Sequence, residues 1–171
     1  SCEDGLVEQS IANGGVMPLY KEMGLPGIDY LGNRYTSVNL MKQITSVAHI
    51  ENKPYVLSES FGCSGWNVSF KKLMSVVGWQ AVFGINTFCV HLSAYTISGR
   101  RKRDYPAFFS YQEPWWDDCG QLMNAIRKLS SCINDGERLT RVAVVHPMRS
   151  AWALGEENSK YISSDFRELQ N

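Results

Sequence analysis

The chain has 171 residues, 44% of them hydrophobic and 20% charged, which is enough for one domain with a core and does not by itself require two. The 17 basic and 17 acidic residues cancel, so no overall field favours binding to nucleic acid or to an anionic membrane. No apolar run approaches the roughly 20 residues of a membrane-spanning helix.

The first part of the chain predicts alternating helices and short strands. Apolar residues recur at helical spacing in the segment that ends at Lys53-Pro54, with Thr36 or Ser37 available as N-cap. The β-formers that follow predict a strand bounded by turn residues. In chain order the expected elements are a helix, a strand, a helix and a strand over residues 15–22, 27–31, 36–52 and 55–58.

The second part of the chain continues this pattern. Its expected elements are a helix, a strand, a long loop, a helix and a strand over residues 69–83, 85–92, 99–120, 122–133 and 141–146. Alternation of this kind is typical of α/β proteins with parallel sheets. A loop of about twenty residues is long enough to be functional.

Three predicted strands end in polar side chains, Asp29, Glu59 and His91. Parallel α/β proteins bind ligands at the carboxyl ends of their strands, because the following loops converge there. Glycines after Glu59 would let the backbone approach a ligand closely. A structural role stays open for each residue: Glu59 as a cap or ion-pair partner, Asp29 as a turn-former and His91 as a rim group.

The aromatic residues of the loops have two readings. Trp115 and Trp116 either cover the end of the fold or stack on the apolar face of a sugar ring, and Trp66 is placed to shape the same site. The basic run 100–103 has no interleaved aromatic residues, which makes it a weak nucleic-acid signal. A solvated loop or a contact to an anionic ligand is the expected alternative.

The five cysteines, Cys2, Cys63, Cys89, Cys119 and Cys132, are odd in number and form no CxxC pair. They predict neither a disulfide framework nor a zinc site, and unpaired thiols slightly favour a cytoplasmic location. No thiol has an evident base beside it in the sequence. The chain contains no GxGxxG, Walker or HExxH motif, so we expect no organic cofactor, and no set of metal ligands can be read from the sequence.

Four segments carry a family resemblance: PLYKEMGLPGIDYLG, KQITSVAHIENKPYVLSESFGCSGW, GWQAVFGINTFCVHLSAY and YPAFFSYQEPWW. Together they resemble the second half of the catalytic TIM barrel of large bacterial glycoside hydrolases. They are similar to the α-L-rhamnosidases of glycoside hydrolase family 106 and, more distantly, to the β-galactosidases of family 42. The resemblance covers roughly residues 1–150.

The resemblance implies a fold and a division into domains. Residues 1–138 would be a partial (β/α) barrel, about its last three or four βα units, with Asp29, Glu59 and His91 at the ends of the sixth, seventh and eighth strands. Residues 139–171 would begin a following α/β domain or extension, whose first strand is 141–146.

The resemblance also implies a chemistry. Glu59 would be the nucleophile of a retaining glycosidase or the general base of an inverting one, while Asp29, Asn86 and His91 would hold sugar hydroxyls. Trp66, Trp115 and Trp116 would shape the subsite. The second catalytic acid normally comes from the fourth strand of the barrel, so we expect this chain alone to have little activity.

The expected function is therefore glycoside hydrolysis by the chain or by a protein of which it is a fragment, with a carbohydrate as the partner. Open sheet edges tend to pair, so a homodimer is also expected to be possible. One alternative is a non-catalytic carbohydrate-binding or assembly module. The other is an open α/β domain that binds an anionic ligand through Arg100 to Arg103.

Overall fold

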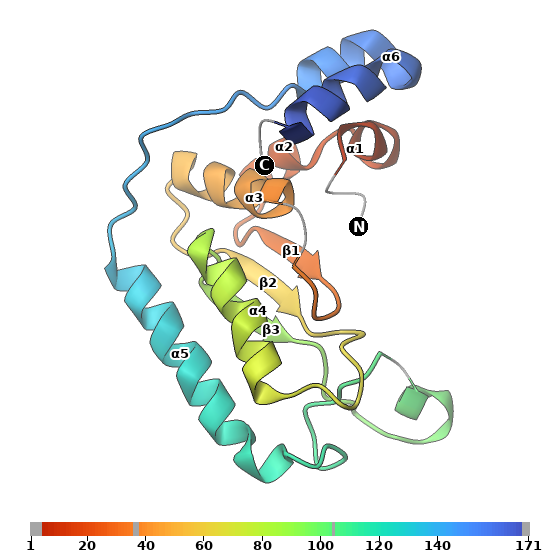
Figure 1. Cartoon of the computed structure of the whole chain (residues 1–171), viewed down its shortest axis with the longest axis vertical. Coiled ribbons are helices and arrows are strands. Elements are labelled where there is room, and N and C mark those ends of the chain that lie inside the picture. The colour runs from red at the N-terminus through yellow and green to blue at the C-terminus, as the bar shows by residue number, and fades with distance from the viewer. Residues whose placement is uncertain (1–4, 36–37, 104, 169–171) are drawn as a thin grey trace.

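The protein has an α/β fold built around a small parallel sheet. The computed structural model describes residues 5–35, 38–103 and 105–168. Its strands β1 (Gly27–Tyr30), β2 (Leu57–Ser60) and β3 (Thr87–Val90) lie side by side in the order β1-β2-β3. Both pairings are parallel, and Figure 1 shows a helix in each connection between consecutive strands. The α/β class predicted from the sequence is confirmed.

The helices largely follow the apolar periodicity of the sequence. The predicted segments 15–22, 36–52, 69–83 and 122–133 correspond to the four helices α2 to α5, whereas the short helix at the start and the long one at the end were not predicted. The observed helices are α1 (Leu6–Ala12), α2 (Val16–Glu22), α3 (Val38–Ile50), α4 (Phe70–Val82), α5 (Cys119–Asp135) and α6 (Met148–Glu168), with 3₁₀ turns η1 (Gly99–Arg103) and η2 (Trp116–Asp118) in the long loop.

Local sequence signals define both ends of α4. The Ser69 side chain accepts a hydrogen bond from the Lys72 backbone N–H at 3.3 Å, which satisfies one of the free donors of the first turn. After the helix, Gly84 adopts a φ of +100°, a conformation that favours glycine. The N-cap residues predicted for α3, Thr36 and Ser37, lie outside the described residues.

The main core forms where α3 and α4 cover one face of the sheet, while α5 packs along α4 (Figure 1). Met41 and Ile44 from α3 and Leu73 and Val77 from α4 are fully buried here. From the sheet, β1 contributes Tyr30. Burial of these side chains supplies the dominant favourable term in folding.

The strand β2 contributes hydroxyl groups to this buried face. The Ser58 and Ser60 Oγ atoms lie 3.0 Å apart, and the Gln80 side-chain amide donates to Ser60 Oγ at 3.1 Å. All three residues are fully buried, so their polar groups depend on one another for hydrogen bonds. The network therefore joins the middle of the sheet to α4.

The observed strands correct three of the predicted elements. β3 (Thr87–Val90) is two residues shorter at each end than the predicted strand 85–92. β2 begins and ends two residues later than predicted, so Glu59 lies within the strand. The strand predicted for 141–146 is absent: this segment is described and has no ladder partner. Its Val142, Val144 and Val145 are exposed. High β-propensity is insufficient here, because a strand needs a neighbouring strand to satisfy its backbone.

The segment after α5 leads back to the first helix. Residues 136–147 run without helix or strand from the end of α5 to α6, and α6 packs against α1 (Figure 1). Leu6, Met148 and Ala151 form a second, smaller buried cluster at this contact.

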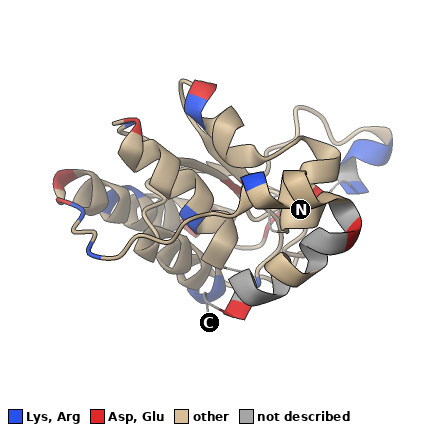
Figure 2. Ribbon diagram, turned by 90° about the horizontal axis from the view of Figure 1, so that it is seen from above, with Lys and Arg blue, Asp and Glu red and all other residues tan. Residues whose placement is uncertain are grey.

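Charged residues are scattered over the ribbon rather than gathered on one face, apart from the basic segment of η1 (Figure 2). None of the helices in the described part of the chain combines the length and the hydropathy that a membrane span needs.

We predict that Leu73→Ala lowers the free energy of unfolding by about 2–5 kcal/mol, because the truncation leaves a cavity in the main core. Urea unfolding followed by circular dichroism measures this change. Val82→Ala on the same helix is the matched control, since Val82 is 80% exposed and its truncation should cost less than about 0.5 kcal/mol. Equal effects of the two substitutions would contradict this account of the core.

Candidate functional site

Two carboxylates share one face of the sheet. The register pairs Asp29 with Glu59 and Glu59 with Cys89, so the three residues lie in one row across the strands. Side chains alternate between faces along a strand, and neighbouring strands are about 4.8 Å apart. Because Tyr30 and Ser60 point into the core, Asp29 and Glu59 project from the opposite face, where Asp29 and Cys89 are exposed.

His91 joins Glu59 at the carboxyl end of the sheet. The His91 backbone N–H donates to Ser60 O at 2.8 Å, which continues the ladder one residue beyond β3. Its Nε2 atom lies 3.9 Å from Glu59 Oε1. The Glu59 side chain is 45% exposed and that of His91 19% exposed, so the carboxylate faces solvent while the imidazole supports it from one side.

The turn after β2 leaves room for this imidazole. A Cβ atom at Gly62 would lie 2.9 Å from Leu31 Cδ2, closer than real Cβ contacts come, and 3.1 Å from His91 Cγ, which is tighter than most real Cβ contacts. The preceding residue, Phe61, is fully buried and has a φ of +82°, which is rare for a bulky side chain. The glycine and the unusual backbone together let the turn pass close to His91.

The loops that follow β2 and β3 pack against each other at the carboxyl end of the sheet. Gly65 N–H donates to Pro106 O at 2.9 Å, and the rings of Trp66 and Phe108 meet edge to face at 5.2 Å. Trp66 is nevertheless exposed on its other side. An indole fixed in this way presents an apolar surface near the carboxyl end of the sheet.

The two adjacent tryptophans of the long loop have different environments. The Trp115 ring packs between Phe70 at 5.1 Å and Phe109 at 5.4 Å and so belongs to the core. Trp116 is exposed. The structure therefore does not present them as a paired platform, and Trp116 is the member that is free to contact a ligand.

Asn86 lies at the opposite end of the sheet from the other candidates. Its side chain accepts from Val56 N–H and donates to Pro54 O, both at 2.8 Å. Val56 precedes Glu59 by three residues, a separation of about 10 Å along a strand. The structure does not bring Asn86 together with Glu59, because its amide is used to fasten the starts of β2 and β3.

Sequence reasoning missed a buried carboxyl group, Glu113, in the long loop that follows β3. The residue is 3% exposed, and loss of hydration raises its pKa above the ordinary value of 4.5, while the backbone amide of Phe108 acts in the opposite direction. Its setting in the sequence FFSYQEPWW, an acid among aromatic residues, was the available signal.

The remaining candidates stay apart from this row. The basic run 100–103 forms η1, at the outer end of the long loop (Figures 1 and 2). The described residues include no group of three or more histidine, cysteine or acidic side chains that could hold a metal ion. The site is thus a solvent-facing row with two carboxylates, flanked by an imidazole, and it can bind hydroxyl groups or activate a bound water.

These features define an α/β domain with an open, three-stranded parallel sheet. No family model matches the chain, and no curated protein matches it. Its fold is similar to part of a solved structure, the rhamnosidase from Novosphingobium sp. PP1Y, with a TM-score of 0.55 and 19% sequence identity. The match covers 70% of this chain and 13% of the rhamnosidase chain. At this identity the likeness shows the fold alone.

We predict that Glu113→Gln stabilises the protein at pH 7. Because the folded-state pKa lies above the unfolded value, folding opposes ionisation of this carboxyl, and the cost is fully present above the folded pKa. The cost disappears as the pH falls below 4.5, so the gain from the substitution should disappear there too.

Urea unfolding of both proteins at pH 7 and pH 4 tests this expectation. Glu22→Gln serves as the control, because Glu22 is exposed on α2. A gain that is the same at both pH values would rule out ionisation of Glu113 as its cause.

Proposed function

We propose that this chain forms part of the active site of a glycoside hydrolase, with Glu59 as the catalytic carboxylate. The observation that carries the proposal is the row on the open face of the sheet, where Glu59 is in register with Asp29 and 3.9 Å from His91. The similarity of the fold to part of a rhamnosidase supports the same reading.

The proposed architecture is a segment of a (β/α) barrel. In such a barrel the helices lie outside and alternate strand residues point inward, which agrees with a sheet covered on one face and open on the other. Closure requires a neighbour for the free edges of β1 and β3, supplied by further strands of the same polypeptide or by a second copy. Residues 139–171, as the start of another domain, belong to the same proposal.

Each residue of the row has a role in the proposal. Glu59 attacks the anomeric carbon in a retaining mechanism or takes a proton from the attacking water in an inverting one. Asp29 accepts hydrogen bonds from sugar hydroxyls, and His91 holds both Glu59 and a hydroxyl. Trp66 and Trp116 offer exposed indole faces to the sugar ring.

The reaction requires a second carboxyl group that protonates the leaving oxygen. Asp29 occupies the neighbouring strand, and the proposal assigns it to substrate binding. Glu113 is protonated more readily than an ordinary carboxyl, yet it is almost completely buried. Both the inverting and the retaining mechanism need this proton donor, and we expect another strand of the barrel to supply it.

We predict that Glu59→Gln, made in the longest natural form of the protein, lowers kcat for nitrophenyl α-L-rhamnoside hydrolysis by about 10²–10⁴-fold. Glutamine keeps the size of the side chain but cannot act as a nucleophile or base. Binding of the sugar, measured by calorimetry, should persist. Glu22→Gln on the distant surface of α2 is the control for loss of one negative charge.

Unchanged turnover of Glu59→Gln would remove this residue from the mechanism. Sugar binding by the wild-type protein without hydrolysis of any nitrophenyl glycoside would instead favour a carbohydrate-binding module.

A further inference from the structure

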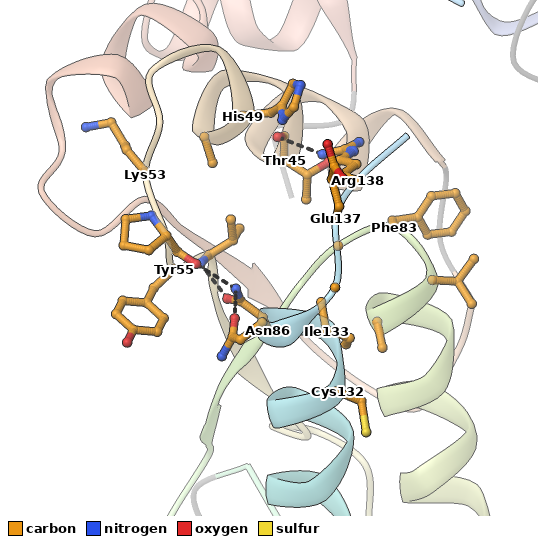
Figure 3. A pocket seen from close by; sticks show the side chains of 18 of the residues that line it. Thr45, His49, Lys53, Tyr55, Phe83, Asn86, Cys132, Ile133, Glu137 and Arg138 are labelled. Carbon is orange, nitrogen blue, oxygen red and sulfur yellow. Dashed lines mark hydrogen bonds between the residues drawn. The ribbon is translucent and has the colours of Figure 1, made fainter. Parts of the chain in front are cut away.

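A pocket lies at the opposite end of the sheet from Glu59. It has a volume of about 890 Å³, within the range of ligand sites in proteins. Its walls come from α3 between Lys42 and His49, from the ends of α4 and α5, and from the segments 53–56 and 136–139 (Figure 3). Asn86, to which the family resemblance assigned a sugar-binding role, lines this pocket instead.

Two cations, Lys42 and Arg138, line the pocket. Arg138 Nη1 donates to Thr45 O at 3.0 Å, and this contact, drawn in Figure 3, brings the guanidinium against α3. Lys42, one turn earlier on α3, lies with its Nζ 5.3 Å from the centre of the Phe83 ring. Gly84, the next residue after Phe83, lies beside the guanidinium: a Cβ atom there would be 3.7 Å from Arg138 Nη1.

Neither cation forms an ion pair with a carboxylate in the described part of the chain. Burial lowers the pKa of Lys42, and the charge of Arg138 lowers it further by a smaller amount. The pKa of Arg138 is itself lowered by burial. Two like charges in one partly desolvated wall repel each other, and an anion between them would relieve this repulsion.

The rest of the lining is mixed in character. The formal charges are those of Lys42, Lys53 and Arg138 against Glu137, which leaves the pocket positive. The side chains of Tyr55, Phe83 and Ile133 add apolar surface (Figure 3). Such a combination suits a ligand with one anionic end and one apolar end.

A structural role for the cations is the competing explanation. The C-terminal ends of three helices meet at this pocket, and helix C-termini carry partial negative charge that favours nearby cations. This role does not require a pocket of ligand size between them, so the two explanations differ in whether an added anion binds.

We propose that this pocket binds a small molecule that joins an apolar or aromatic body to an oxyanion group, with Lys42 and Arg138 holding the oxyanion. The guanidinium has N–H groups besides the one bonded to Thr45 O, and the ammonium provides a second point of attachment. The proposal is independent of sugar hydrolysis, because it uses no residue of the Glu59 row.

Calorimetric titration with phenyl phosphate, benzoate and phenol tests the proposal. The first two probes distinguish a phosphate from a carboxylate as the oxyanion, and phenol supplies the same ring without a charge at pH 7. We expect saturable binding of at least one anionic probe, about tenfold tighter than that of phenol. Absence of saturable binding by both anions would overturn the proposal.

Two variants locate the binding. Lys42→Gln should lower the affinity for the anionic probe by about five- to tenfold. Lys72→Gln should leave this affinity unchanged, because Lys72 lies outside the pocket. It is a matched control, since the Lys72 Nζ atom also stands over an aromatic ring, 4.5 Å from the centre of that of Tyr35. Equal affinities in the wild type and Lys42→Gln would place the anion elsewhere and refute the site.

An alkylation experiment checks the location without any substitution. Cys132 is exposed and lines the pocket, whereas Cys89 is exposed on the row of Glu59. The bound probe should slow the reaction of Cys132 with iodoacetamide and leave that of Cys89 unaltered, as measured by peptide mass spectrometry. Protection of Cys89 alone would contradict the proposal.

Discussion

The parallel register of β1, β2 and β3 determines how the rest of the molecule is arranged. With side chains alternating between the faces, Tyr30 and Ser60 are directed to the helices, and Asp29 and Glu59 consequently share the open face. A shift of one residue in either pairing would bring a carboxylate into the core and expose a core residue. The core and the candidate site therefore depend on the same hydrogen-bonded ladder.

Buried polar groups help to make this register specific. In the middle of the core, Ser60 bonds with Gln80 of α4, and at the start of the strands Asn86 bonds with the backbone on either side of Tyr55. A slipped strand would leave these groups buried without partners, which is costly in a low-dielectric interior. Apolar contacts alone would tolerate such a slip more easily.

Much of the fold was predictable because its signals are local. The apolar periodicity of α3, α4 and α5 and the glycine after α4 indicated the helices, and their alternation with short β-rich segments indicated a parallel sheet. The strand predicted for 141–146 was wrong, because β-propensity does not report whether a partner strand is present. The exact limits of β2 depend on the register with β1, which no local pattern encodes.

The candidate site was predictable in part. The rule that polar residues gather at the carboxyl ends of parallel strands placed Asp29, Glu59 and His91 correctly near one another. The same rule could not separate Trp115, whose ring is packed between phenylalanines, from the exposed Trp116. The rule also could not reveal that the Asn86 side chain is used in hydrogen bonds before its strand begins, or that Glu113 is buried. Both features depend on contacts with residues distant in sequence.

The pairing of α1 with α6 has a consequence for the order of folding. These helices are separated by more than a hundred residues in the chain, and their shared cluster of Leu6, Met148 and Ala151 is separate from the main core. Closing so long a loop is entropically slow compared with forming the neighbouring βα units. We therefore expect α1 and α6 to pack together late in folding. We also expect this contact to open by local unfolding while the sheet and its covering helices stay folded.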